Sequence, residues 1–332
     1  MTIPLSILDL APITPGQTAR ESFASSVLLA QTAERSGYTR VWYAEHHNMA
    51  SIASSATSVL IGHVAEHTST IRLGSGGVML PNHSPLVIAE QFGTLATLFP
   101  DRIDLGLGRA PGSDQQAARA MRRDPMASEQ FPQDVLELQA YLRGESIVPG
   151  VQAVPGGGTD VPLYILGSST FGAQLAAALG LPFAFASHFA PDSLFDAIEI
   201  YRRDFRPSAQ LSAPHMIVGV NVIAAEDEDD AQQQFITTRR DRVRAMISRG
   251  PAARAFTDDE IDAFLTTRDG MYIANMMKYT AVGTPSQVRT YLEDFAATTK
   301  ADELITAHQS IDIASRLRSV ELTADAMSTV AA

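Results

Sequence analysis

The chain contains no cysteine among its 332 residues, and this absence excludes several kinds of chemistry. Disulfide bonds, thiolate nucleophiles, iron–sulfur clusters and cysteine-ligated zinc all require cysteine sulfur. Lysine is almost as rare, since only Lys278 and Lys300 occur, so arginine provides nearly all of the positive charge. The formal net charge is −12, which would repel a phosphate backbone, and we therefore expect no binding of nucleic acid.

Long apolar runs are also missing, and we expect no N-terminal targeting signal. No apolar run approaches the roughly 18 residues that a membrane-spanning helix needs, and the mean hydropathy is close to zero. Residues 1–4 include no basic segment and lead directly into an apolar stretch. We therefore expect a cytoplasmic protein that does not associate with membranes. Hydrophobic residues make up 45% of the chain, which is ample for a large buried core.

Apolar segments alternate with helical patterns along the whole chain. The predicted strands are 3–10, 40–44, 71–74, 103–107, 163–166, 183–186, 215–224 and 303–306. The predicted helices are 18–36, 53–67, 85–98, 133–143, 171–179, 192–205, 285–295 and 311–320. Strands that alternate with helices pair in parallel through right-handed crossovers. Eight such units predict an α/β protein with a closed (β/α)8 TIM barrel.

We predict a single domain, 1–332. Two of its segments depart from the alternation of strands and helices. Residues 145–160 are rich in proline and glycine and predict a loop-like excursion. Residues 226–281 form an insertion after the seventh strand, where an acidic run opens a long helix. Thr257 and Glu260 have the spacing of a capping box, and the apolar segment 271–279 is either core or a lid.

Arginine and hydroxyl side chains follow two predicted strands. Active sites of such barrels lie at the carboxyl ends of the strands. Arg109 could bind two phosphate oxygens at once, although a surface ion pair is an alternative. Gly167, Ser168 and Ser169 precede a helix, where hydroxyls and free N–H groups suit an anion, although simple N-capping would also explain them. Together these residues indicate a cofactor that bears a phosphate.

Histidines follow the second predicted strand, in the sequence Glu45, His46, His47. Neighbouring residues of a strand point to opposite faces, so both imidazoles could bind one metal ion only beyond the strand end. His63 and His67 fit the H-x-x-E-H pattern of some zinc proteases, but their helix ends at the face opposite the catalytic strand ends. We therefore expect no metal site.

Glycines follow the third and fourth predicted strands. Gly76 and Gly77 lack side chains, so a flat ring system could lie against the backbone there, although an ordinary turn is equally consistent. Residues 106–112 nearly match the G-x-G-x-x-G fingerprint of dinucleotide-binding proteins, but the spacing is one residue too long. The chain also contains no G-K-[ST] sequence, which excludes a P-loop.

These motifs resemble the bacterial luciferase-like monooxygenases, which are flavin-dependent enzymes with a (β/α)8 barrel. The resemblance extends over essentially the whole chain. Its most specific parts are residues 42–47, 71–81, 101–112 and 163–182. It implies that the barrel binds reduced FMN at its mouth.

The resemblance also implies a role for each candidate residue. Arg109 and the turn 167–169 match the positions that bind the FMN phosphate, and Gly76 and Gly77 match a non-proline cis peptide beneath the isoalloxazine ring.

His46 matches the catalytic histidine near the reactive flavin edge, and His47 matches its neighbour. Ala11 and His188 would line the same pocket, His188 on its catalytic side.

The family resemblance implies a monooxygenase in which reduced FMN and O2 form a C4a-peroxyflavin that oxidises a small organic substrate, such as an aldehyde. A separate flavin reductase would supply the reduced FMN, and the family implies a homodimer. Gly108 stands where the light-emitting subunit has a reactive cysteine, and Ser168 stands where it has a glutamate. These two departures argue against light emission.

Three other functions stay open at this stage. Some relatives are F420-dependent dehydrogenases on the same barrel. A serine hydrolase could use Ser169 with His188 or His215, although Phe171 occupies the last glycine position of the G-x-S-x-G motif. The third alternative is a flavin-binding protein without catalytic activity.

Overall fold

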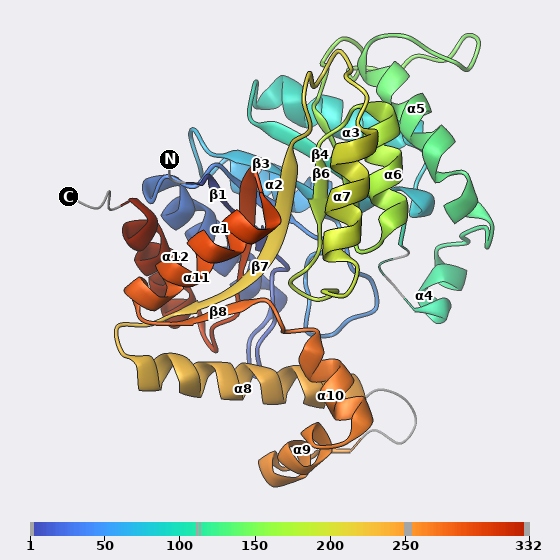
Figure 1. Ribbon diagram of the computed structural model, residues 1–332. Coiled ribbons are helices and arrows are strands. Elements are labelled where there is room, and N and C mark those ends of the chain that lie inside the picture. Colours follow the sequence, from blue (N-terminus) through green and yellow to red (C-terminus); the bar gives the residue numbers. More distant parts are fainter. Residues whose placement is uncertain (1–2, 111, 113, 249–253, 329–332) are drawn as a thin grey trace.

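The computed structural model describes residues 3–110, 112, 114–248 and 254–328. Its strands form a closed ring in the order β1-β2-β3-β4-β5-β6-β7-β9, with β9 returning to β1 (Figure 1). Every pairing in the ring is parallel, and helices surround it. The predicted (β/α)8 barrel is therefore confirmed.

The strands lie close to their predicted positions. They are β1 (Leu5–Asp9), β2 (Arg40–Tyr43), β3 (Arg72–Met79), β4 (Ile103–Gly108), β5 (Leu163–Gly167), β6 (Phe183–Phe185), β7 (Met216–Ala224), β8 (Thr280–Gly283) and β9 (Glu303–His308). The strand β8 was not predicted. β7 has nine residues, so it can pair with β6 at its start and with β8 at its end. A strand of four residues that follows an apolar helical segment shows too little alternation to be recognised.

The helices cover the outside of the ring and the end at which the strands have their carboxyl termini. They are α1 (Ala19–Arg35), α2 (Thr57–Ala65), α3 (Pro85–Leu98), α4 (Gln115–Ala120), α5 (Phe131–Leu142), α6 (Thr170–Leu179), α7 (Leu194–Asp204), α8 (Glu228–Ile247), α9 (Asp258–Leu265), α10 (Arg268–Asn275), α11 (Pro285–Thr299) and α12 (Ile313–Ser328), with short 3-10 helices η1 (Leu80–Asn82) and η2 (Ala127–Glu129). The prediction missed α4 and extended α2 by four residues at its start. None of the described helices is both long and apolar enough to cross a membrane.

Local sequence sets the ends of several helices. Thr18 and Glu21 form a capping box at the start of α1, and Gly37, at φ +78°, follows the end of that helix as predicted. The predicted capping box of Thr257 and Glu260 begins α9. These interactions satisfy backbone groups that a helix leaves without intrahelical partners at its termini.

The apolar core has an outer and an inner layer. The outer layer lies between the strands and the helices and is the larger of the two. The inner layer fills the barrel with Leu8, Trp42, Ala44, Tyr164, Ala184, Ile217 and Ile305. Successive residues of a strand point to opposite faces, so each strand contributes to both layers.

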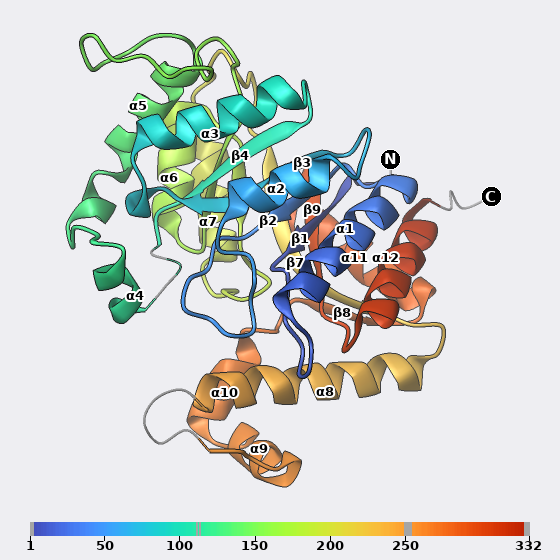
Figure 2. The same cartoon turned by 180° about the vertical axis from the view of Figure 1, so that it is seen from behind.

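The insertion after β7 forms a layer of three helices, α8, α9 and α10, across one end of the barrel (Figure 1). The Thr238 hydroxyl of α8 donates to the carbonyl oxygen of Gln309 at 2.6 Å, just after β9. Asn275 at the end of α10 donates to Asp192 at 3.0 Å, in the loop after β6. The layer therefore covers the carboxyl ends of the strands, and the loops after β1 and β2 reach toward it (Figure 2).

Buried charges cross the barrel interior near the amino ends of the strands. The guanidinium of Arg40 lies 2.7 Å from the Asp104 carboxylate and 3.0 Å from that of Glu303. Arg72 makes a second ion pair with Asp104, and the indole N–H of Trp42 donates to the same carboxylate at 3.1 Å. Asp104 is completely buried, so its negative charge depends on these partners.

We expect Asp104→Ala to lower the free energy of unfolding by about 3–5 kcal/mol, because it leaves the Arg40 guanidinium with one fewer partner in a buried site. Urea unfolding measures the change. Asp204→Ala removes an exposed ion pair with Arg203 and should lower the free energy of unfolding far less. Equal losses for the two variants would contradict this account of the buried network.

Candidate active site

The ends of β4 and β5 bring together the two predicted phosphate-binding elements. The Arg109 guanidinium carbon lies 3.9 Å from the centre of the Phe171 ring, which belongs to the first turn of α6. Ser168 and Ser169 precede that turn and are exposed. Ser169 is the N-cap residue of α6, yet its side chain makes no capping hydrogen bond. Simple N-capping therefore does not explain this turn.

The charge of Arg109 is also not neutralised within the described part of the chain. No described carboxylate forms an ion pair with it, and its side chain is exposed. The first N–H groups of a helix have no intrahelical partners and attract an anion. The arrangement therefore suits a phosphate group between Arg109 and the start of α6.

Gly76 and Gly77 lie inside β3, not after it as predicted, because the strand continues to Met79. Their peptide bond is cis, as the family resemblance implies. The pairing with β4 shifts register at this point, between Ser75 and Val78. A Cβ atom on Gly77 would lie 2.7 Å from the Gly106 carbonyl oxygen, so the backbones approach too closely for any side chain. Gly76 is partly exposed and provides a flat surface of backbone.

Ala11 follows β1 with a φ of +46°, an uncommon value for a residue with a side chain. Its N–H donates to the Asp9 carboxylate at 2.9 Å, and Arg316 pairs with the same carboxylate at 3.0 Å. Ala11 is fully buried. These contacts fix the backbone where the chain leaves the barrel.

Glu45 is the centre of a hydrogen-bond network at the end of β2. Its buried carboxylate accepts from His47 Nε2 at 2.8 Å, from His83 Nε2 at 2.9 Å and from the Met79 N–H at 2.9 Å. Burial raises the pKa of Glu45, but the hydrogen bonds from His83, His47 and Met79 outweigh that effect and lower it. The network joins the end of β3 to the loop after β2.

His46 and His188 each have a buried Nδ1 atom without a hydrogen-bond partner. Burial lowers the pKa of His46. Burial, followed by the charges of Arg242 and His46, lowers the pKa of His188 to about 3. Both imidazoles are therefore neutral at pH 7, and the loops after β2 and β6 bring them near each other.

His215 lies at the opposite end of the barrel. It precedes β7, and its Nε2 atom lies 3.4 Å from Glu303 among the buried charges. No hydrogen bond among the described residues joins the Ser169 hydroxyl to His215 or His188. A hydrolase that uses Ser169 and His215 is therefore excluded by their separation.

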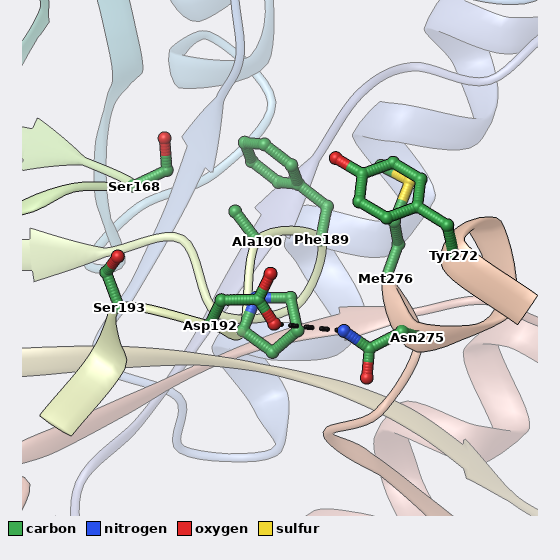
Figure 3. A pocket seen from close by; sticks show the side chains of 9 residues that line it. Ser168, Phe189, Ala190, Asp192, Ser193, Tyr272, Asn275 and Met276 are labelled. Carbon is green, nitrogen blue, oxygen red and sulfur yellow. Dashed lines mark hydrogen bonds between the residues drawn. The ribbon is translucent and has the colours of Figure 1, made fainter. Parts of the chain in front are cut away.

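A cavity of about 290 Å³ lies beside the Ser168 turn, between the loop after β6 and α10 (Figure 3). It is lined by Ser168, Phe189, Ala190, Pro191, Asp192, Ser193, Tyr272, Asn275 and Met276. The sequence did not indicate this lining, although it predicted that segment 271–279 is either core or a lid. In the structure Tyr272 of α10 is exposed, and Met277, two residues after that helix, is buried, so the segment contributes both to the surface and to the core.

The His63 and His67 rings lie 4.8 Å apart at the end of α2, away from the strand ends described above. Within the described residues, no group of three or more histidine, aspartate or glutamate side chains is placed to hold a metal ion.

Comparison with known proteins identifies the family. The family model described as luciferase-like monooxygenase matches residues 3–302. The chain belongs to the luciferase-like monooxygenase family. A protein of Escherichia coli K12 named luciferase-like monooxygenase is 50% identical over 326 residues, covering 98% of this chain and 97% of that protein. An N-acetyl-S-alkylcysteine monooxygenase of Bacillus subtilis is 33% identical over 318 residues, covering 91% and 92%.

Solved structures of similar proteins agree with this assignment. Apo-MsnO8 has a TM-score of 0.85 and 35% identity, with 98% of both chains covered. The oxygenating constituent of 3,6-diketocamphane monooxygenase of Pseudomonas putida, in complex with FMN, has a TM-score of 0.73, 16% identity and coverage of 98% and 97%. An F420-dependent secondary alcohol dehydrogenase has a TM-score of 0.70, 14% identity and coverage of 99% and 100%. The last two likenesses show the fold alone. As a member of this monooxygenase family, the chain is an oxidoreductase.

The low pKa of His188 predicts a stability that depends on pH. Between about pH 6.5 and pH 3 the unfolded chain binds a proton at this imidazole and the folded chain does not, so stability falls as the pH falls. We expect His188→Gln to make the loss shallower by up to about 1.4 kcal/mol per pH unit in urea unfolding. Phe189→Leu changes the neighbouring ring without removing a titrating group and should keep the original slope. An unchanged slope for His188→Gln would contradict the low pKa.

Proposed function

We propose that the protein is a reduced-FMN-dependent monooxygenase that inserts one atom of O2 into a small organic substrate, with an aldehyde as a candidate. The observation that supports this most is the pairing of Arg109 with the uncapped start of α6. The relatives at 50% and 33% identity have names that include monooxygenase, whereas the F420-dependent dehydrogenase is only 14% identical. These names favour FMN and oxygen over F420 and hydride transfer.

The described residues fit FMN in several ways. Arg109, Gly167, Ser168 and Ser169 would hold the phosphate, since the guanidinium has no ion-pair partner and the helix start has no cap among the described residues. Reduced FMN, when bound, would supply the two electrons that reduce the second oxygen atom to water.

The backbone near the barrel axis would support the flavin ring. Gly76 and Gly77 provide a surface without side chains, and a Cβ atom on Gly76 would meet Leu8 at 2.7 Å and Trp42 at 2.9 Å. Ala11, just after β1, would adjoin this surface from its buried side. The inner apolar layer lies directly below, so the ring would rest on a rigid support.

His46 would accept or donate the proton that is transferred during the reaction. Its buried Nδ1 atom has no protein partner and is therefore available to a bound group. An imidazole that is neutral at pH 7 can accept a hydrogen bond or a proton at this atom. His188, whose Nδ1 atom is equally free, would form the other side of the site.

Glu45 and His47 would hold the neighbouring His46 in position rather than take part in the reaction. The hydrogen bond of 2.8 Å from His47 to Glu45 fixes the ring next in sequence to His46. Layer α8–α10 would restrict access of water to the barrel mouth. We also propose that a separate reductase supplies reduced FMN and that two copies of the chain associate, both on the basis of the family resemblance.

Anaerobic titration with reduced FMN, followed by mixing with ¹⁸O2 and a series of aldehydes, tests this function. The protein should bind reduced FMN, change its rate of oxidation from that of free flavin, and place ¹⁸O in the product. Oxidation at the rate of free flavin with unlabelled product would contradict the proposal. Reduction of F420 by a secondary alcohol without consumption of O2 would favour the dehydrogenase instead.

Arg109→Met should weaken FMN binding by about 10- to 100-fold, because a charge-assisted contact to the phosphate is lost. Riboflavin lacks the phosphate, so its affinity should change little. Fluorescence titration with both flavins measures the difference. Arg119→Met removes an exposed arginine of α4 and should leave both affinities unchanged. An equal loss for FMN and riboflavin would show that Arg109 does not bind the phosphate.

His46→Ala should lower the yield of oxygenated product per reduced FMN by about 100-fold and increase the release of hydrogen peroxide. The reason is that the variant lacks the imidazole that accepts or donates the proton. The affinity for reduced FMN should stay within twofold of the original. His67→Ala, at the end of α2, serves as the control and should keep the full yield. Unchanged coupling in the His46 variant would exclude this role.

A further inference from the structure

Helix α8 contains four arginines, and two of them, Arg239 and Arg242, form no ion pair with a described residue. Arg239 lies over the Phe235 ring, and its charge helps to lower the pKa of Asp262 of α9, so it faces that helix. Arg240 pairs with Asp262, and Arg244 pairs with Asp258, so both are neutralised by α9. Arg242 forms no ion pair with any described residue, and its buried Nη1 atom has no hydrogen-bond partner. A buried guanidinium nitrogen without an acceptor is costly, and such groups are normally paired.

The position of Arg242 on the helix directs it to the barrel. Residues two apart on a helix lie on nearly opposite sides, so Arg242 points away from the face on which Arg240 and Arg244 meet α9. Residues four apart share a face, which places Arg242 one turn beyond Thr238. The Thr238 hydroxyl binds the carbonyl oxygen of Gln309 at the carboxyl end of β9. Arg242 therefore faces the mouth of the barrel.

The surroundings of Arg242 at the mouth provide no negative charge. Its own charge contributes to the low pKa of His188, which places the two side chains near each other. Burial lowers the pKa of Arg242, and no carboxylate offsets this effect. His188 and His46 can be neutral or positive but never negative, so they cannot balance the guanidinium. Arg242 thus adds a second positive charge at this end of the barrel, besides that of Arg109, that no described carboxylate neutralises.

An apolar surface adjoins this charge. The His188 and Phe189 rings lie 5.1 Å apart, and Phe189 also lines the cavity beside α10. Tyr272 of α10 and Met276, just after that helix, line the same cavity (Figure 3). A molecule with an apolar body and one anionic end would match both features. Ser168, which belongs to the turn proposed for the flavin phosphate, lines the same cavity, so the phosphate and the substrate would be neighbours there.

We propose that Arg242 binds a carboxylate group of the organic substrate, and that the enzyme accepts small carboxylate-bearing molecules with an apolar chain. A planar guanidinium can bind both oxygens of a carboxylate in parallel, which fixes the direction of the substrate as well as its position. The proposal rests on the monooxygenase function proposed above. Its test therefore measures binding of flavin and of carboxylate separately.

The probes are sodium octanoate and the uncharged octanamide, titrated calorimetrically into the FMN-loaded protein. We expect octanoate to bind at least tenfold more tightly than octanamide. Arg242→Met should abolish this difference, and Arg242→Lys should retain part of it, because lysine keeps the charge without the planar fork. Arg244→Met, on the opposite side of α8, should leave the preference for octanoate unchanged.

The outcomes separate the two proposals. Fluorescence titration should give the same FMN affinity for Arg242→Met as for the original chain. Failure of the original chain to bind FMN would overturn the proposed function. Normal FMN binding with equal affinity for octanoate and octanamide, or with no binding of either, would overturn the role of Arg242. A preference for octanoate that persists in Arg242→Met, or competition between octanoate and FMN, would also overturn it.

Discussion

The pairing of β6 with β7 closes the sheet, and the site depends on that closure. Phe183 lies opposite Met216, and Phe185 lies opposite Val218, in a parallel register of three residues. Without this contact the strands would form an open sheet, and the ends of β2 and β6 would lie far apart. Closure instead brings His46 and the loop after β6 to the same opening. Segments from distant parts of the chain thereby share one site.

The two ends of the barrel differ in whether their arginines have carboxylate partners. At the amino ends, Arg40 is enclosed by Asp104 and Glu303, and the charges are balanced within the protein. At the carboxyl ends, Arg109 and Arg242 have no carboxylate partner among the described residues. The balanced end stabilises the fold, and the unbalanced end is suited to anionic ligands. This contrast explains how a chain with a net charge of −12 can still attract an anion.

The sequence was sufficient for the ring of strands and for part of the candidate site. Apolar segments, glycines at helix ends and a family resemblance located Arg109, His46 and the turn before α6. The four-residue strand β8 was missed because it is too short to show a period. The roles of Glu45 and Arg242 were missed for another reason. Each is one acidic or basic residue among several, and only tertiary packing decides which of them is paired and which faces the barrel.

The most direct test of the central claim is a crystal structure of the complex with FMN. The account predicts phosphate density between Arg109 and the first turn of α6, with the flavin ring against Gly76 and its reactive edge toward His46. Arg242 should lie beyond that edge without contact to the phosphate. Phosphate density at Arg242, or a flavin ring away from β3, would contradict the account.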